Sequence, residues 1–417
     1  EKVTKDGTTR IDGKTKQLKS GYIVDVLEDE PNVVMFSKYE VKRRQFNQTL
    51  YKITLEQLFT DNFDNAEFIE KADDGLFMYD FDNATDRLLA VFYDEDEESI
   101  QIKFKRLGAK NWKTALSFDN GQFDFSPVGF IDDNHLAVLT NKETDKIALY
   151  SFNIETKALD TLLYQHQEYD LTDATLSKTG DIESVEYVKS GLPKKIWLNK
   201  RSQKLSSRFE ATFSDRVPRI IDRDIKTGRT IVYVAGPNEA GKYYLYEQNS
   251  DSLAMLVANY PDLSELTFPE HRVLSIKTED DMSIEAYLTL PTDYSVNTLL
   301  VMPHGGPIGV RDYNFFEPNV QYLANRGFTI LRVNFRGSEG YGKAFQKKGV
   351  GEFGKQIEAD ISAAVSEVLK TQQFENVCAI GSSYGAYSSV SLALHHPELY
   401  KCVVASYGIY DLPLLFN

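Results

Sequence analysis

Residues 377–394 read VCAIGSSYGAYSSVSLAL, and this stretch gives the clearest indication of the fold of the C-terminal part of the sequence. Four apolar residues typical of a buried strand lead into Gly381-Ser382-Ser383-Tyr384-Gly385, and a run suited to an α-helix follows. A serine on so tight a strand-to-helix turn needs small residues two positions away on each side, because a Cβ there would collide with packed backbone. Gly381 and Gly385 meet this need, so the pattern predicts a nucleophilic serine, Ser383.

The same turn predicts one part of an oxyanion hole. It directs the backbone N–H of Tyr384 toward the place where an oxyanion would form, beside the N-terminus of the following helix. A second motif, His304-Gly305-Gly306-Pro307, follows the apolar run 299–302 and is expected at the same sheet edge. Consecutive glycines let the backbone approach a ligand and leave an N–H free, so we expect Gly306 to be the second donor.

Two further side chains lie near the glycine motif, and we give neither of them a catalytic role. His304 is interpreted as a structural hydrogen-bonding residue, because that is the commoner role of a histidine beside such a loop. Arg311 could contact a carbonyl or carboxylate of a substrate, but we interpret it as a solvated surface side chain.

Strand-like and helical segments alternate after about Pro261. A hairpin is expected first, at 272–277 and 284–290. Short apolar runs bounded like buried strands follow at 299–302, 328–333 and 377–380, and Ile357, Ile361, Val365 and Val368 form one stripe of a helix. This order predicts right-handed βαβ connections and a mainly parallel sheet. We therefore assign residues 263–417 to an α/β-hydrolase domain.

A repeat of 47 residues precedes that domain. It is marked by four valines in short strand-like runs, Val91, Val138, Val185 and Val232, and by a second series in step with them, Ile102, Leu149, Ile196 and Tyr243. Repeats of this length with several strands each are typical of β-propeller blades, which bury both faces of every sheet. We assign residues 1–262 to an all-β propeller with about five blades visible and expect it to be incomplete. An irregular β-sandwich is the alternative.

Composition excludes several classes of function. The 417 residues carry a formal net charge of −15, with 42% hydrophobic and 26% charged residues, as in an ordinary soluble protein of more than one domain. So acidic a chain is not expected to bind nucleic acid, and no apolar run is long enough to span a membrane. Cys378 and Cys402 each lie in an apolar stretch and are interpreted as buried hydrophobic residues, with no disulfide framework or zinc site. We expect no metal or cofactor.

Several motifs in sequence order resemble the landmarks of the prolyl oligopeptidase family, in its acylaminoacyl-peptidase and dipeptidyl-peptidase branch. These motifs are His304–Pro307, Asn334–Gly342, Phe353-Gly354 and Gly381–Tyr387. The resemblance covers about residues 300–411 and implies a serine peptidase that takes short peptides, with the propeller shielding the site from folded proteins. Two positions depart from the family pattern, Ala386 where a further glycine is usual and Phe353 where tryptophan is usual.

A larger departure from the family pattern is the lack of a histidine that could act as general base for Ser383. In this fold the acidic residue and the histidine of the catalytic triad follow the serine along the chain. Only 34 residues follow Ser383, and they hold one aspartate, Asp411, with His395 and His396 near the end of the predicted helix. Twelve helical residues rise about 18 Å, too far for either imidazole to reach the hydroxyl of Ser383. The other histidines, His135, His166 and His271, are assigned to the propeller or its edge.

We therefore expect a serine peptidase that cleaves short peptides through an acyl-enzyme on Ser383, of aminopeptidase, dipeptidyl-peptidase or oligopeptidase type. The sequence is interpreted as a fragment without its C-terminal end, inactive by itself and expected to fold poorly or to bind a partner that completes the sheet. Two alternatives are a catalytically dead peptide-binding protein and an esterase on the same scaffold. Self-association into a homo-oligomer and a cytoplasmic or periplasmic location stay open.

Overall fold

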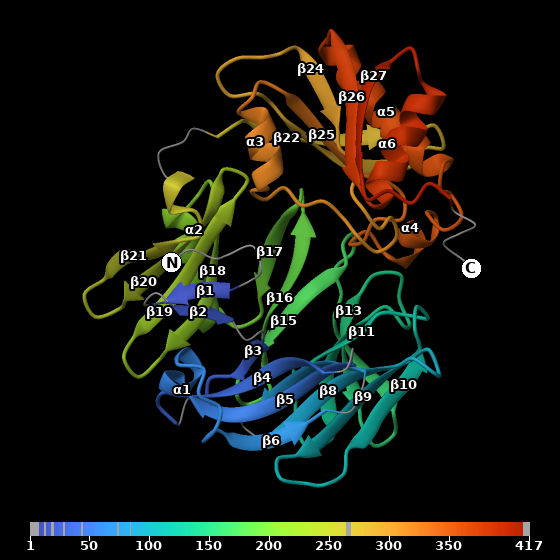
Figure 1. Ribbon diagram of the computed structural model, residues 1–417. Coiled ribbons are helices and arrows are strands. Elements are labelled where there is room, and N and C mark those ends of the chain that lie inside the picture. Colours follow the sequence, from blue (N-terminus) through green and yellow to red (C-terminus); the bar gives the residue numbers. More distant parts are fainter. Residues whose placement is uncertain are drawn as a thin grey trace. The chain divides into compact units, whose positions relative to one another are not determined.

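The computed structural model describes residues 8–11, 14–17, 21–27, 30–42, 45–72, 75–83, 85–263 and 268–411. Figure 1 shows its helices and strands, coloured along the sequence. The residues fall into two compact units. Unit 1 comprises Glu1–Lys142, Leu149–Leu163 and Leu176–Asp181, and unit 2 comprises Glu143–Ala148, Tyr164–Thr175 and Ile182–Asn417. The expected domain boundary near residue 262 therefore lies inside unit 2, and it stays a prediction.

Unit 1 consists of antiparallel sheets joined in sequence order. After a hairpin of β1 (Thr8–Ile11) and β2 (Lys14–Gln17) come three sheets of four strands each. Their strands are β3 (Gly21–Asp25), β4 (Val33–Lys42), β5 (Gln45–Thr54) and β6 (Glu67–Lys71); β7 (Leu76–Asp82), β8 (Arg87–Asp94), β9 (Ser99–Arg106) and β10 (Lys113–Asp119); β11 (Phe125–Phe130), β12 (His135–Thr140), β13 (Ala148–Asn153) and β14 (Ala158–Tyr164). Helix α1 (Leu55–Phe59) lies between β5 and β6.

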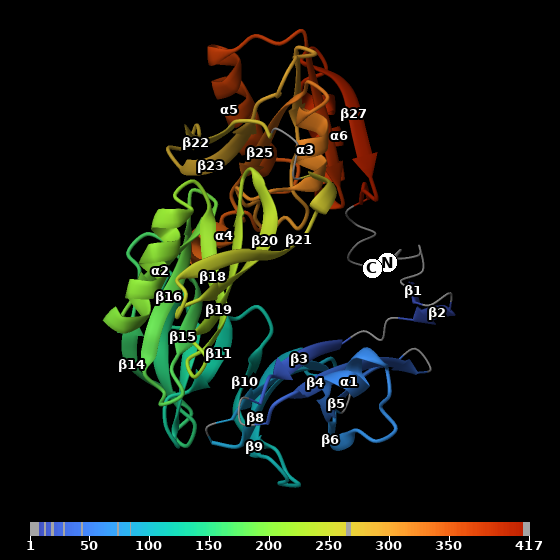
Figure 2. The ribbon, with the colours of Figure 1, turned by 90° about the vertical axis from the view of Figure 1, so that its left-hand side faces the viewer.

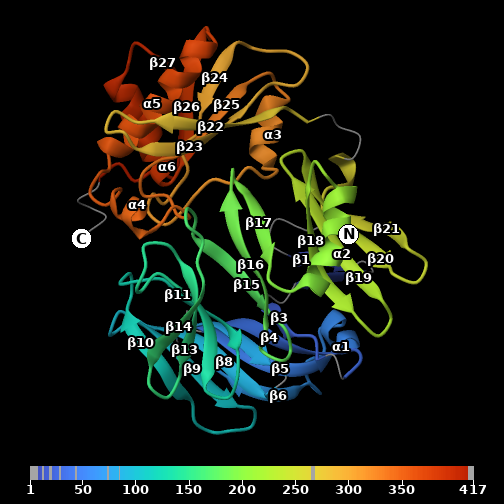
Figure 3. The same cartoon turned by 180° about the vertical axis from the view of Figure 1, so that it is seen from behind.

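Unit 2 adds two more sheets of the same kind. One has three strands, β15 (Leu171–Leu176), β16 (Ile182–Lys189) and β17 (Leu192–Trp197). The other has four, β18 (Val217–Asp224), β19 (Arg229–Gly236), β20 (Glu239–Glu247) and β21 (Ser252–Ala258), and the short helix η1 (Pro261–Leu263) follows. Helix α2 (Lys200–Thr212) comes where a fourth strand would stand and packs against β17 and β18 (Figures 2 and 3).

The 47-residue repeat corresponds to one position in successive sheets. Val91, Val138, Val185 and Val232 lie on the second strands β8, β12, β16 and β19, and the second series lies on the third strands β9, β13, β17 and β20. Val91 pairs with Ile102 and Val185 with Ile196, whereas Val232 pairs with Tyr244, one residue beyond the second series. Five consecutive antiparallel sheets of this kind form a β-propeller, as the sequence predicted.

A mixed sheet of six strands follows the propeller, in the spatial order β22-β23-β25-β24-β26-β27. Its strands are β22 (His271–Lys277), β23 (Ser283–Thr289), β24 (Thr298–Val301), β25 (Thr329–Asn334), β26 (Asn376–Ser382) and β27 (Tyr400–Ser406). The first two form the expected hairpin, and β23 is antiparallel to β25. The four strands from β25 to β27 are parallel. This is the α/β-hydrolase part of the fold, and His271 opens its first strand rather than belonging to the propeller.

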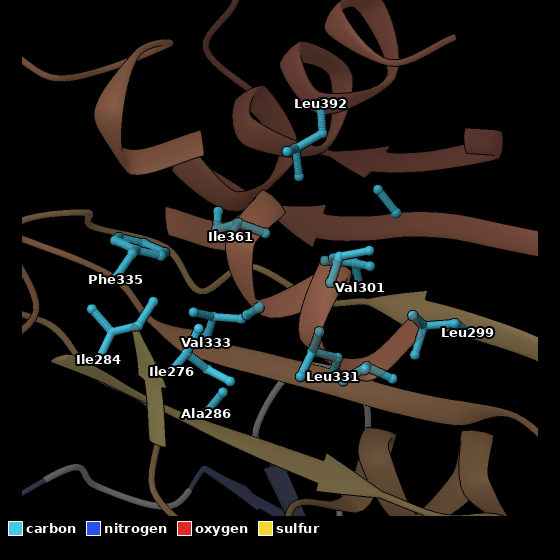
Figure 4. Packing of buried hydrophobic residues seen from close by; sticks show 14 of the residues in the cluster. Ile276, Ile284, Ala286, Leu299, Val301, Leu331, Val333, Phe335, Ile361 and Leu392 are labelled. Carbon is cyan, nitrogen blue, oxygen red and sulfur yellow. The ribbon is translucent and has the colours of Figure 1, made fainter. Parts of the chain in front are cut away.

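Alternate side chains of the central strands point to opposite faces, and each face is covered by helices. Leu299, Val301, Leu331 and Val333 pack against Ile361 and Leu392 of helices α5 (Gln356–Thr371) and α6 (Tyr384–His395) (Figure 4). Leu300 and Ile330 pack instead against α3 (Pro318–Ala324). A shorter helix, α4 (Lys343–Lys347), follows β25. Among the described helices, none is long and apolar enough to cross a membrane.

The two cysteines correct the sequence interpretation. Cys378 on β26 and Cys402 on β27 are direct neighbours in the parallel strand pair, with their Cα atoms 4.8 Å apart, and their sulfurs form a disulfide bond. Cys378 is buried as expected, whereas Cys402 is exposed, contrary to the expectation. The expectation of two separate buried thiols is wrong because it considered each apolar stretch alone, whereas the register of the two strands sets the sulfurs side by side.

The core predicts different costs for the same substitution at two valines. Val365 on α5 is 1% exposed within the core, whereas Val350 is 65% exposed. Replacing Val365 by alanine should lower the free energy of unfolding by about 2 kcal/mol, because two buried methyl groups are lost and a cavity remains. Val350→Ala should change it by less than about 0.5 kcal/mol. Denaturant titration followed by circular dichroism measures both, and equal costs would contradict this packing.

The disulfide predicts the thiol count of the protein. Unfolded in denaturant without reductant, the chain should titrate with no free thiol, and after reduction it should show two. Cys378→Ser should leave one free thiol and lower the free energy of unfolding by about 3 kcal/mol, since the bond closes a loop of 24 residues. Two thiols reacting before reduction would show that the bond is absent.

Candidate active site

Ser383 lies on a sharp turn between β26 and α6. Its backbone has φ 55° and ψ −124°, a conformation that a residue with a side chain rarely adopts, and the residue is exposed. A hydrogen bond to the neighbouring strand stabilises the turn, because the Ser383 N–H donates to the carbonyl oxygen of Ser406 at the end of β27. The structure thus has the strand, turn and helix that the sequence predicted, with the hydroxyl-bearing residue at the apex.

The two flanking glycines are required by close backbone contacts. A Cβ on Gly381 would lie 2.3 Å from the carbonyl carbon of Gly385, and one on Gly385 would lie 2.1 Å from the carbonyl oxygen of Pro303. Neither distance is attainable between real atoms. The first turn of α6 is therefore packed directly on the backbone that leaves β24, so the residues after Pro303 must lie beside Ser383.

The glycine motif lies against the turn that carries Ser383. A Cβ built on Gly305 would be 3.7 Å from the Cβ of Ser383. Gly306 has φ 112°, and a Cβ on it would come within 3.0 Å of Val310, so only glycine fits there without strain. The structure therefore brings Ser383 together with the segment that carries the predicted Gly306 donor.

Tyr384, the other predicted donor, is the first residue of α6. The first backbone N–H groups of a helix have no partner within the helix, so this N–H is available to a ligand at the helix end. The side chain is 6% exposed, and its hydroxyl donates to Oε1 of Glu358 on α5 at 2.8 Å. Burial first, and then the Glu358 carboxylate, raise the pKa of the phenol far above its usual value, so it stays a hydrogen-bond donor.

His304 is held as a structural residue. Its Nδ1–H donates to the carbonyl oxygen of Gly305 at 2.7 Å, and its Nε2 accepts from the hydroxyl of Ser338 at 3.0 Å. The ring stacks on Phe335 with the centroids 4.2 Å apart. Burial lowers the pKa of this imidazole, which favours the neutral ring that these two bonds require. Both ring nitrogens of His304 are therefore engaged with Gly305 and Ser338.

The segment after β25 joins the motifs to the core and to a propeller loop. Arg336 donates to both carboxylate oxygens of Asp360 on α5, at 2.9 and 2.7 Å. These bonds are the largest cause of the raised pKa of Arg336. Further along, the Gly342 N–H donates to Oδ2 of Asp170 at 2.9 Å. Ser338, which contacts His304, lies between these two anchor points.

Arg311 corrects the sequence interpretation. It is 6% exposed, so it is not a solvated surface side chain. Its Nη2 donates to the hydroxyl of Tyr341 at 2.8 Å and to Oε1 of Glu285 at 3.2 Å. The guanidinium thereby connects the loop after the glycine motif with β23 and with the segment after β25.

The described histidines have hydrogen-bond partners other than Ser383. His395 contacts the carbonyl oxygen of Ser391 through Nδ1, at the far end of the 12-residue helix that Ser383 precedes. His271 contacts Thr289 and Gln321, and burial lowers its pKa to about 4. Each of these rings has partners of its own, and no hydrogen bond in the described part of the chain joins a histidine to Ser383.

Sequence reasoning missed Glu358 and Phe335 as parts of the site. Glu358 precedes Ile361 and Val365 at steps of three and seven residues, so helical periodicity assigns it to the buried face of α5. A carboxylate at a buried position is a signal in its own right, because it must be paired. Phe335 lies within the motif Asn334–Gly342, but a single aromatic residue after the last residue of β25 gives no signal for a particular role.

Comparison with known proteins finds similarity in the C-terminal part of the sequence. Residues 313–416 match the family model described as the prolyl oligopeptidase family. Dipeptidyl peptidase family member 6 of Caenorhabditis elegans is 28% identical over 215 residues, which is 45% of this chain and 29% of that protein. Dipeptidyl aminopeptidase BIII of Pseudoxanthomonas mexicana is 32% identical over 187 residues, 42% of this chain and 27% of that protein. The chain thus matches less than a third of the length of these relatives.

Solved structures share the fold. The crystal structure of puromycin hydrolase aligns with a TM-score of 0.61 at 16% identity, over 96% of this chain and 64% of that one. Acylaminoacyl peptidase of Pyrococcus horikoshii aligns with a TM-score of 0.56 at 16% identity, over 95% of this chain and 71% of that one. At these identities the likeness concerns the propeller and hydrolase architecture alone. Residues 313–416 of this chain thus match the prolyl oligopeptidase family, and the two relatives are named dipeptidyl peptidase and dipeptidyl aminopeptidase.

Proposed function

We propose that this chain carries the nucleophile and the oxyanion hole of a peptidase that cleaves short peptides. The observation that carries the proposal is the contact between two segments, in which Ser383 at the apex of its turn lies against the Gly305-Gly306 loop. A nucleophile beside free backbone N–H groups is the arrangement that acyl transfer needs. The relatives, named dipeptidyl peptidases, support a peptide as the acyl donor.

In the proposed reaction the Ser383 Oγ attacks the carbonyl carbon of the scissile peptide bond, and its proton passes to a histidine base. The carbonyl oxygen becomes an oxyanion that accepts hydrogen bonds from the Tyr384 and Gly306 N–H groups. Collapse of this intermediate expels the amine, which takes the proton from the histidine and leaves an acyl-serine. Water, deprotonated by the same base, then releases the carboxylic acid and restores Ser383.

We infer that the base and its acidic partner come from polypeptide outside the present sequence. The support is that each of its six histidines is described and none is hydrogen-bonded to Ser383 in the described structure. We accordingly expect peptide binding and the full reaction only in the native full-length protein. The 417 residues alone are proposed to be inactive.

A fluorophosphonate probe tests the nucleophile. In the native full-length protein the probe should label Ser383, because an elbow serine next to a base attacks phosphorus readily. Ser383→Ala should abolish labelling, whereas Ser382→Ala, which removes the adjacent exposed hydroxyl, should keep it. Tandem mass spectrometry of the labelled peptide locates the adduct. An unlabelled folded wild-type protein would exclude the enzyme and favour a peptide-binding protein.

Substrate size should limit the reaction. A propeller in the same chain restricts access in the way inferred for the family, so peptides of a few residues should be cleaved and folded proteins spared. A ladder of peptides of increasing length, followed by mass spectrometry, measures the limit. A native folded protein of about 100 residues serves as the control, and its efficient digestion would contradict the proposal.

A further inference from the structure

Glu358 is an acidic residue buried in the hydrolase core. It is 5% exposed on the inner face of α5, between Ile357 and Ile361, which are both fully buried. Burial is the largest influence on its carboxyl group and raises its pKa. Among the described residues Glu358 forms no ion pair, so its burial is not explained by a nearby cation. Because removing a carboxyl group from water costs free energy, a buried acid needs a specific polar partner.

The first partner is the residue next to the proposed nucleophile, and the buried hydroxyl of Ser388 is a second one. The Tyr384 hydroxyl donates to Glu358 Oε1 at 2.8 Å, and its ring packs on Phe353 and Tyr387, with centroids 5.1 and 5.6 Å away. A tyrosine fixed at its hydroxyl and along its ring has little freedom at its own backbone. The backbone N–H of this residue is one of the two proposed oxyanion donors.

The other proposed donor is reached through the same ring. Phe335, fully buried, lies 6.2 Å from the Tyr384 ring on one side and stacks on His304 at 4.2 Å on the other. His304 in turn is bonded to the carbonyl of Gly305, directly before Gly306. A continuous row of packed side chains therefore runs from α5 through the nucleophile turn to the glycine loop.

We propose that Glu358 is a positioning residue that sets the Tyr384 N–H relative to the Gly306 N–H in the oxyanion hole, acting through the Tyr384 phenol. The inference rests on the proposed function, because it assigns a task within that reaction. Donors in an oxyanion hole stabilise the transition state only if they are fixed before charge develops, and one such donor is worth about 10²–10³ in kcat. A displaced donor should therefore cost turnover and leave substrate affinity nearly unchanged.

The test compares three single variants and one double variant of the native full-length protein. Glu358→Leu removes the acceptor, Tyr384→Phe removes only the donating oxygen, and Glu358→Gln keeps an acceptor oxygen. With a chromogenic peptide substrate, the Leu and Phe variants should lose at least about 10-fold in kcat with KM within about 2-fold, and the Gln variant should stay within about 3-fold of wild type. The double variant Glu358→Leu/Tyr384→Phe should lose no more than the worse single variant, since both remove one hydrogen bond.

A transition-state analogue separates positioning from stability. A peptidyl trifluoromethyl ketone forms a hemiketal oxyanion on the serine, so its inhibition constant should rise in proportion to the loss in kcat/KM. Tyr400→Phe is the matched control, because it removes another buried phenol from the same core without touching the Glu358–Tyr384 bond, and it should behave as wild type.

Two results would overturn the inference. If Glu358→Leu and Tyr384→Phe lower the melting temperature but keep kcat and inhibitor affinity, Glu358 is only a structural residue. If the losses in the double variant multiply, the two residues act separately. Should Glu358→Leu fail to fold, Tyr384→Phe carries the test, because it deletes a single oxygen atom. A wild-type protein that neither turns over substrate nor takes the fluorophosphonate label would instead refute the proposed function itself.

Discussion

Close backbone contact at the nucleophile turn is the constraint from which the rest of the site follows. Gly385 sits so near the Pro303 carbonyl oxygen that a side chain is impossible, and this contact joins α6 to the chain leaving β24. The strained backbone of Ser383 persists because the surrounding packing determines it from both sides. Because Pro303 directly precedes the glycine loop, this contact fixes the loop beside Ser383. Two motifs about 80 residues apart in sequence therefore form one site.

The parallel strand order brings the remaining parts to the same edge. The carboxyl ends of neighbouring parallel strands meet at one edge of a sheet, so the segments after β24, β25 and β26 are adjacent although the chain visits the strands far apart in sequence. The segment after β25 contributes Phe335 and Ser338, which contact the ring of His304 from its face and its edge. Rigid strands thereby place loops that would be poorly determined by themselves.

Local patterns sufficed to predict the elements, and long-range pairings did not follow from them. The helical stripe of Ile361 and Val365 and the repeat of Val138 and Val185 are periodic signals, so helix, strands and propeller sheets could be read directly. The disulfide depends on the register of β26 against β27, which no single stretch encodes. The burial of Arg311 likewise depends on partners about 30 residues away, so only tertiary structure reveals it.

At Glu358 the helical spacing and the charge of the residue give conflicting predictions about its burial. Its spacing to Ile361 assigns it to the core, whereas its charge argues for the surface, and each local rule taken alone gives an opposite answer. The hydroxyl that resolves the conflict comes from Tyr384, which reaches the core only because the strained turn at Ser383 starts a helix there. A charged residue at a core position is tolerated when interactions in the rest of the structure stabilise it. The buried acid and the strained serine are therefore parts of one arrangement, in which a hydrogen bond joins the core of the domain to the turn at Ser383.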